Sequence, residues 1–218
     1  MTWGRLTVQG GFLLLMAFLV FLDTAGLLLW MAAAAFVHEA GHWVALRLAG
    51  GRVARWELSL RGVSMRLPAW PALSYGRELL ATLAGPAANL ACAFAAALWA
   101  GHTKNAGLYT WAGVSLFQGG FNLLPARGQD GGHALHLLLC WRWHAAAADR
   151  VLTVLTGLCA AGAAAAGLWA YHTAGRDITV LAAAAYAALS LLAPGEDRRP
   201  VFPNDPKNKM SISKGTVQ

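Results

Sequence analysis

Charged residues are scarce in this sequence: they make up 12% of the 218 residues, whereas 57% are hydrophobic. A water-soluble domain of this size needs more charge to cover its surface, so the composition indicates a membrane protein. Cysteine is scarce as well, because there are only three, and each stands alone in an apolar stretch. This spacing argues against both a disulfide framework and a zinc site made of cysteines.

Six apolar segments follow one another along the chain, and a helix needs about 20 residues to span a bilayer. They cover residues 6–22, 25–46, 79–100, 107–124, 151–171 and 178–193. We therefore predict an all-α polytopic membrane protein with about six transmembrane helices in a single domain, residues 1–193. The polar segment 194–218 is predicted to be a disordered cytoplasmic tail.

Basic residues collect on one side of this predicted topology. Fifteen of the 17 Lys and Arg fall at the N-terminus, in the loops 47–77 and 127–150, or in the tail, whereas Lys104 and Arg176 fall on the other side. Cytoplasmic loops carry the excess of Lys and Arg, so both termini are predicted to be cytoplasmic. The topology also explains the net charge of +7, and nucleic-acid binding is not expected.

A different pattern lies between the second and third apolar segments, over residues 51–68. Polar and apolar residues alternate there around Arg61-Gly62, which is typical of a short β-hairpin with one apolar and one basic face. An open sheet edge cannot face lipid, so we expect the hairpin to lie at the membrane interface or against protein.

His38, Glu39 and His42 form an H-E-x-x-H pattern within the second apolar segment. Residues four apart lie on the same face of a helix, so both imidazoles can reach one metal ion, and zinc suits such a pair. Glu39 beside them can take a proton from a water molecule at the metal. The alternative is a chance match or a pair of structural histidines, but ionisable residues inside an apolar helix usually have a function.

A third metal ligand must come from elsewhere, and Asp130 is the outstanding candidate. Pro125 is predicted to end the preceding helix, and Asp130 stands before a new helical run over 131–143. An aspartate at this place also commonly caps the helix, so both roles stay open. His133 and His136 are expected to be polar residues of an interfacial helix, or, for His133, a residue that supports a metal ligand.

Three motifs occur in order along residues 25–145. They are the H-E-x-G-H of residues 38–42, the G-x-x-x-N from Gly85 to Asn89, and the N-x-x-P-x-x-x-x-D-G from Asn122 to Gly131. Together they resemble the site-2 protease family of intramembrane zinc metalloproteases. The early first motif and the lack of an inserted PDZ-type domain look most like the branch with the sporulation protease that processes pro-sigma-K. Residues 127–129 differ, because Arg-Gly-Gln stands where more apolar residues are expected.

The resemblance implies one zinc ion, with His38, His42 and Asp130 as its ligands and Glu39 as the general base. The expected activity is endopeptidase cleavage in or near a transmembrane segment of a membrane-associated protein, such as a sigma-factor precursor or an anti-sigma factor. The setting would be a prokaryotic inner or plasma membrane, where other membrane proteins would regulate the enzyme.

Two asparagines are further candidates for the site. By the same resemblance, Asn122 would help to hold the substrate or stabilise an oxyanion, and the hairpin would present an edge for a substrate strand. Asn89 either approaches the active centre in a similar role or joins helices by hydrogen bonds beside Gly85.

Two functions of other classes stay open from the sequence. One is a catalytically silent zinc-binding membrane regulator, which has no need of the intact Glu39. The other is a metal or proton transporter. The lack of detectable repeats between the two halves of the chain argues against this function.

Overall fold

The structure is a computed structural model, which describes residues 2–3, 6–23, 26–51, 53, 55–59, 62–66, 73–173 and 178–192. Within these residues the chain forms seven helices and one four-stranded sheet. The helices are α1 (Gly10–Leu22), α2 (Leu27–Leu48), α3 (Tyr75–Thr103), α4 (Ala106–Asn122), α5 (Asp130–Arg142), α6 (Ala145–Thr173) and α7 (Ile178–Leu192). The strands are β1 (Thr2–Trp3), β2 (Leu6–Val8), β3 (Arg55–Ser59) and β4 (Gly62–Arg66), in the order β1-β2-β3-β4.

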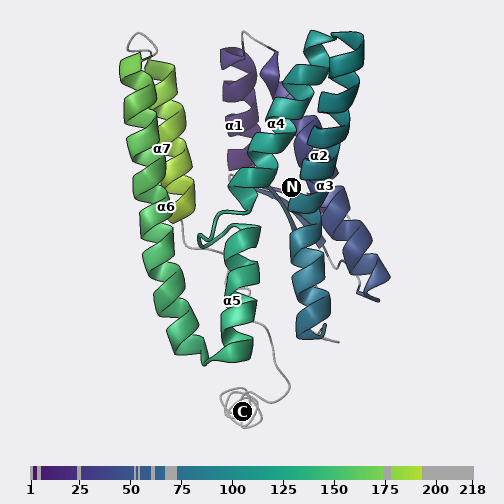
Figure 1. Cartoon of the computed structure of the whole chain (residues 1–218), viewed down its shortest axis with the longest axis vertical. Coiled ribbons are helices and arrows are strands. Elements are labelled where there is room, and N and C mark those ends of the chain that lie inside the picture. Colours follow the sequence, from purple (N-terminus) through teal and green to yellow (C-terminus); the bar gives the residue numbers. More distant parts are fainter. Residues whose placement is uncertain are drawn as a thin grey trace.

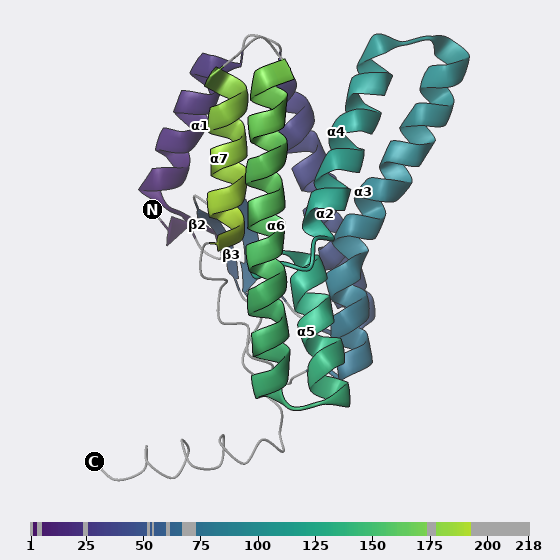
Figure 2. The same ribbon diagram turned by 60° about the vertical axis from the view of Figure 1, so that its left-hand side comes forward.

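Helices α2, α3 and α4 pack against one another, and α6 with α7 forms a helical hairpin beside them (Figure 1). Helix α5 lies between α3 and α6 and packs on both (Figure 2). The end of α4 and the start of α5 are joined by residues 123–129, and this junction lies about halfway along the long helices. The junction therefore brings the start of α5 into the interior of the bundle.

Small residues allow the helices to approach closely. Among the residues that the structure describes, nine of the 13 buried hydrophobic ones are alanines. Where α2 meets α3, a Cβ on Gly41 would lie 2.6 Å from the Ala84 carbonyl oxygen and 2.8 Å from the Ala88 Cβ. Contacts of this kind are typical of helices that pack in membranes, where small side chains bring backbones together.

Two of the described helices, α3 and α6, are long and apolar enough to cross a membrane. Helix α2 has 22 residues, but His38, Glu39 and His42 interrupt its apolar sequence. Helices α1, α4 and α7 are shorter, at 13, 17 and 15 residues. The six-span topology therefore stays a prediction, and the predicted disordered tail lies outside the described residues.

The sheet is larger than the predicted hairpin. Strands β3 and β4 form the expected antiparallel pair, in which Trp56 faces Met65 and Leu58 faces Val63. Strands β1 and β2 join them from the N-terminal segment, and β2 runs parallel to β3. Residues 52, 54, 60–61 and 67–68 of the hairpin lie outside the described residues.

The predicted start of the first transmembrane segment at residue 6 is wrong. Residues 6–8 form β2, the Gln9 amide donates to the Leu58 carbonyl oxygen at 2.9 Å, and α1 begins at Gly10. Three strand residues are too few for alternation to stand out from the apolar run that follows them. Their pairing partner also lies far away in the sequence, so local pattern carries no sign of it.

Candidate metal centre

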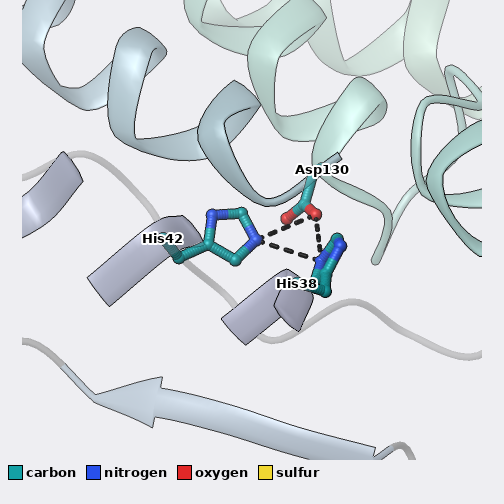
Figure 3. A group of neighbouring side chains, drawn as sticks. All are labelled: His38, His42 and Asp130. Atoms are coloured by element: carbon teal, nitrogen blue, oxygen red, sulfur yellow. Dashed lines mark hydrogen bonds and ion pairs between the residues drawn. The ribbon is translucent and has the colours of Figure 1, made fainter. Parts of the chain in front are cut away.

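His38 and His42 lie one turn apart on α2, and Asp130 is the first residue of α5. The three side chains point toward one another (Figure 3). Asp130 Oδ2 lies 2.9 Å from His38 Nε2 and 3.1 Å from His42 Nε2, and the two Nε2 atoms are 3.1 Å apart. The side chains are 7%, 14% and 13% exposed for His38, His42 and Asp130, so the group is screened from solvent.

The neighbours of His42 fix the state of its ring. Its Nδ1 lies 2.8 Å from the carbonyl oxygen of Ala81, which can only accept a hydrogen bond. A neutral His42 therefore carries its proton on Nδ1 and turns the lone pair of Nε2 toward Asp130. The oxygen of Asp130 also presents lone pairs there, so a metal cation can bind between these atoms. Histidines that bind metals commonly donate their other N–H in this way.

The donor set and its size fit zinc. Zinc binds histidine nitrogen and carboxylate oxygen at about 2.0–2.2 Å, so ligand atoms in a tetrahedral site lie about 3.4 Å apart. The separations of 2.9–3.1 Å are smaller by a few tenths of an ångström, which small side-chain rotations can supply. Three protein ligands leave the fourth position open, as in catalytic zinc sites. His38, His42 and Asp130 can therefore hold a metal ion.

A tight turn places Asp130. A Cβ on Gly131 would collide with the Leu123 carbonyl, and one on Gly132 would collide with the Ala126 carbonyl. The junction between α4 and α5 therefore folds back directly over the first turn of α5, and two glycines after the aspartate make this possible. Gly132 was not predicted from the sequence as part of the site, although an Asp-Gly-Gly stretch before a helix is itself a signal of close backbone approach.

The capping role considered for Asp130 is not the one seen. Gln129 occupies the N-cap position of α5, and its side chain makes no capping hydrogen bond. Asp130 is already helical, and its carboxylate points to the two histidines. A carboxylate in the first turn still interacts favourably with the positive end of the helix dipole.

The absence of a side chain at Gly85 leaves room for the imidazole ring of His42. A Cβ at this position would overlap the His42 imidazole ring, and Gly85 is itself buried in α3. The first residue of the G-x-x-x-N motif therefore allows α3 to lie directly against one of the metal-site histidines.

The predicted general base and the two asparagines lie in different surroundings. Glu39 is half-buried on α2, close enough to His42 to act on it electrostatically. Asn122 ends α4, and its Nδ2 donates to the Gln118 carbonyl oxygen at 3.1 Å. Asn89 has no exposed surface, and its amide has no hydrogen-bond partner within the part of the chain that the structure describes. The catalytic and oxyanion roles stay predictions.

Two more histidines tie α5 to its neighbours. His133 Nε2 lies 3.1 Å from Glu78 Oε1 on α3, and His136 Nε2 lies 3.4 Å from Asp149 Oδ1 on α6. These contacts belong to the scaffold that holds the start of α5. Glu78 was missed as the partner of His133, although a glutamate at the start of a long apolar helix is a signal of its own.

Arg127 fastens the α4–α5 junction to α6. Its backbone amide donates to Thr156 Oγ1 at 2.8 Å. Its guanidinium donates to the Asp149 carbonyl oxygen and to Thr153 Oγ1, both at 2.9 Å. The unusual Arg-Gly-Gln sequence thus makes a structural link just before Asp130.

No protein-family model matches the chain, and no curated protein is significantly similar to it in sequence. Among solved structures, it is similar to a site-2 protease from Methanocaldococcus jannaschii, with a TM-score of 0.63 and 17% sequence identity. The likeness covers 90% of this chain and 94% of that one. At this identity it is the fold that the two proteins share: this chain has the fold of a site-2 protease.

Proposed function

We propose that this chain is a zinc-dependent intramembrane endopeptidase of the site-2 protease type, which hydrolyses a peptide bond in or near a transmembrane segment of a membrane-associated protein. The observation that carries the proposal is the convergence of His38, His42 and Asp130, with Glu39 beside them on α2. The fold shared with a site-2 protease supports it.

A membrane location is supported by the two long apolar helices and by large apolar side chains that face outward. Phe36, Leu48, Phe94 and Phe117 are each 68–85% exposed. Many large apolar side chains exposed in this way along the helices suit contact with lipid. The proposal includes six spans with both termini in the cytoplasm of a prokaryotic cell, because the basic residues are biased to that side.

His38, His42 and Asp130 would hold one zinc ion, which would supply Lewis-acid polarisation of the peptide carbonyl and lower the pKa of water. In the proposed reaction Glu39 accepts a proton from the attacking water and delivers it to the leaving amine. Asn122 has a second amide N–H besides the one donated to Gln118, and this N–H is the proposed donor to the oxyanion.

The substrate is proposed to add as a strand to β4. Among the described strands β4 lies at an edge of the sheet, and it packs against α2, which carries both histidines. An extended peptide presents a scissile bond that a helix would shield, and main-chain hydrogen bonds to the edge would hold it there. Sigma-factor precursors and anti-sigma factors are the proposed substrate class, and other membrane proteins are the proposed regulators.

The test uses the full chain purified in detergent, with bound zinc and cleavage of a candidate membrane substrate as the two measurements. Glu39→Gln is expected to retain zinc and lose cleavage. The matched control is Asp23→Asn, which changes a carboxylate at the far end of α2, where Asp23 accepts from the amides of Leu27 and Leu28 at 2.8 and 2.9 Å. This control is expected to keep both zinc and cleavage.

Each contrary result points to another function. Cleavage that survives in Glu39→Gln would refute the role of Glu39. A wild-type chain that binds zinc and cuts no membrane substrate would favour the silent regulator, and a chain that binds no metal would remove the metal centre itself.

A further inference from the structure

Three buried polar groups of α2, α3 and α4 have no hydrogen-bond partner within the described part of the chain. They are Nδ1 of His38, the amide of Asn89 and the hydroxyl of Ser115. Asn89 and Ser115 are 0% exposed and His38 is 5% exposed. Buried polar groups almost always find a partner in the protein or in ordered water, so each of these three groups calls for one.

Asn89 lies on the face of α3 that meets the metal centre. Gly85 faces the ring of His42, and Asn89 follows it by one helical turn on the same face. Helices α2 and α3 are antiparallel, since Arg77 at the start of α3 donates to the carbonyl oxygen of Ala49 at the end of α2. One turn back along α2 from His42 is His38, so His38 and Asn89 lie at the same level.

Ser115 is a buried residue of α4, one helical turn from the position that faces Asn89. A Cβ on Gly119 would lie 3.2 Å from the Cβ of Asn89, so position 119 of α4 directly faces Asn89. Ser115 precedes Gly119 by one turn, and both residues are buried. The hydroxyl of Ser115 therefore lies about one helical turn from the level of Asn89, a separation that a water molecule can bridge.

We propose that His38, Asn89 and Ser115 enclose a binding site for ordered water, which accepts the Nδ1–H of His38. His38 turns its Nε2 to Asp130, so a neutral ring that offers Nε2 to a metal must carry its proton on Nδ1. A water molecule that accepts this proton and bonds to Asn89 and Ser115 makes about three hydrogen bonds, the usual number for buried water.

The two histidines are thereby held by different partners. The Ala81 carbonyl oxygen accepts from His42, whereas the water at Asn89 and Ser115 accepts from His38. Asn89 and Ser115 are positioning residues that act through His38. The inference rests on the zinc site of the proposed function, although it does not require that the protein be a protease.

The experiment measures the zinc affinity of the full chain in detergent by competition with a chromophoric chelator. Asn89→Leu has about the same volume and removes the polar groups, and it is expected to weaken zinc binding by about 10- to 100-fold. Asn89→Ser keeps a hydroxyl and leaves room for a second water, so its affinity is expected to stay close to that of the wild type. Ser115→Ala is expected to weaken binding in the same direction as Asn89→Leu.

The matched control is Asn105→Ala. Asn105 caps α4 by accepting from the amide of Leu108 at 3.3 Å, at the end of α4 away from the metal centre. This variant is expected to lower thermal stability and leave zinc affinity unchanged. A folded Asn89→Leu that binds zinc as tightly as the wild type would overturn the inference. If Asn89→Leu does not fold, unchanged affinity in Ser115→Ala would overturn it equally.

Two further outcomes separate this inference from the proposed function. If the wild type binds zinc and cuts nothing, only the protease proposal fails, and the affinity comparison still decides the role of Asn89. If the wild type binds no zinc, both proposals fail together. An experimental structure that resolves ordered water is expected to place a molecule within hydrogen-bond distance of all three side chains, and apolar packing there instead would contradict the inference.

Discussion

Gly85 on α3 lies against the imidazole of His42, so closely that a single added carbon atom at position 85 would overlap the ring. The same ring donates to the carbonyl oxygen of Ala81, one turn earlier on α3. Helix α3 therefore sets both the position and the tautomer of one metal-site histidine through its backbone alone, without contributing a side chain.

Replacing Gly85 by alanine is expected to displace His42 and to weaken zinc binding by about tenfold or more. Overpacking should also lower the stability by about 1–3 kcal/mol. Gly101→Ala is the control, because it lies in the same helix and its Cβ would meet nothing within 4 Å. Chelator competition and thermal denaturation measure the two effects; equal zinc affinities for the two variants would contradict the prediction.

Replacing Asp130 by alanine is expected to weaken zinc binding strongly. Changes to residues that hydrogen-bond to metal ligands weaken binding by about 10- to 100-fold, and we expect a larger loss here. The reason is that one of three donors is lost and two histidine lone pairs lose their anionic partner. Asp23→Asn is the matched control, since this carboxylate only accepts from the amides of Leu27 and Leu28 at the far end of α2. Zinc content after dialysis against a weak chelator distinguishes them, and full retention by Asp130→Ala would exclude Asp130 as a ligand.

Replacing Gly132 by alanine is expected to disturb the turn before Asp130, because the added Cβ would meet the Ala126 carbonyl. A backbone neighbour cannot rotate away as a side chain can, so we expect a loss of about 1–3 kcal/mol in stability together with weaker zinc binding. Gly120→Ala, where a Cβ would have open space, is expected to leave zinc affinity unchanged. A Gly132→Ala chain that matches this control in both measurements would show that the turn tolerates rearrangement.

Replacing Arg127 by alanine is expected to lower the melting temperature and to loosen the α4–α5 junction, because two hydrogen bonds from the guanidinium to α6 are lost. Arg127→Lys should recover only part of the effect, since an ammonium group cannot reproduce the planar fork of donors. Arg150→Ala, at an exposed position of α6, serves as the control for lost charge. Protease sensitivity at residues 123–129 provides the measurement, and equal cleavage of all three variants would contradict the link.

The sequence was sufficient to predict which residues form the candidate metal site. Helical spacing places His38 and His42 on one face, and polar residues in an apolar segment stand out. Asp130 stood out as a candidate third ligand and resemblance to a known family supported it, but the local sequence pattern does not show where the start of α5 comes to lie. The contact that brings it to α2 arises from packing of α5 against α3 and α6.

Other features could not be predicted because they depend on partners far apart in the chain. The Ala81 carbonyl that orients His42 is a backbone group, which leaves no mark in the sequence. The pairing of His133 with Glu78 joins two helices, and neither residue's own segment shows which partner it will meet. The burial of Asn89 follows from the close approach of α3 to both α2 and α4, which the small residues permit.

The parallel pairing of β2 with β3 restricts how α1 and α2 can be placed relative to a membrane. Leu6 pairs with Trp56, and α1 and α2 are the helices between them. Both strands belong to one sheet, so the chain must leave the sheet through α1 and return to the same side of the molecule through α2. If these helices enter a bilayer, either both of them cross it or neither does. An arrangement in which one crosses without the other would put β2 and β3 on opposite faces and leave the sheet unmade.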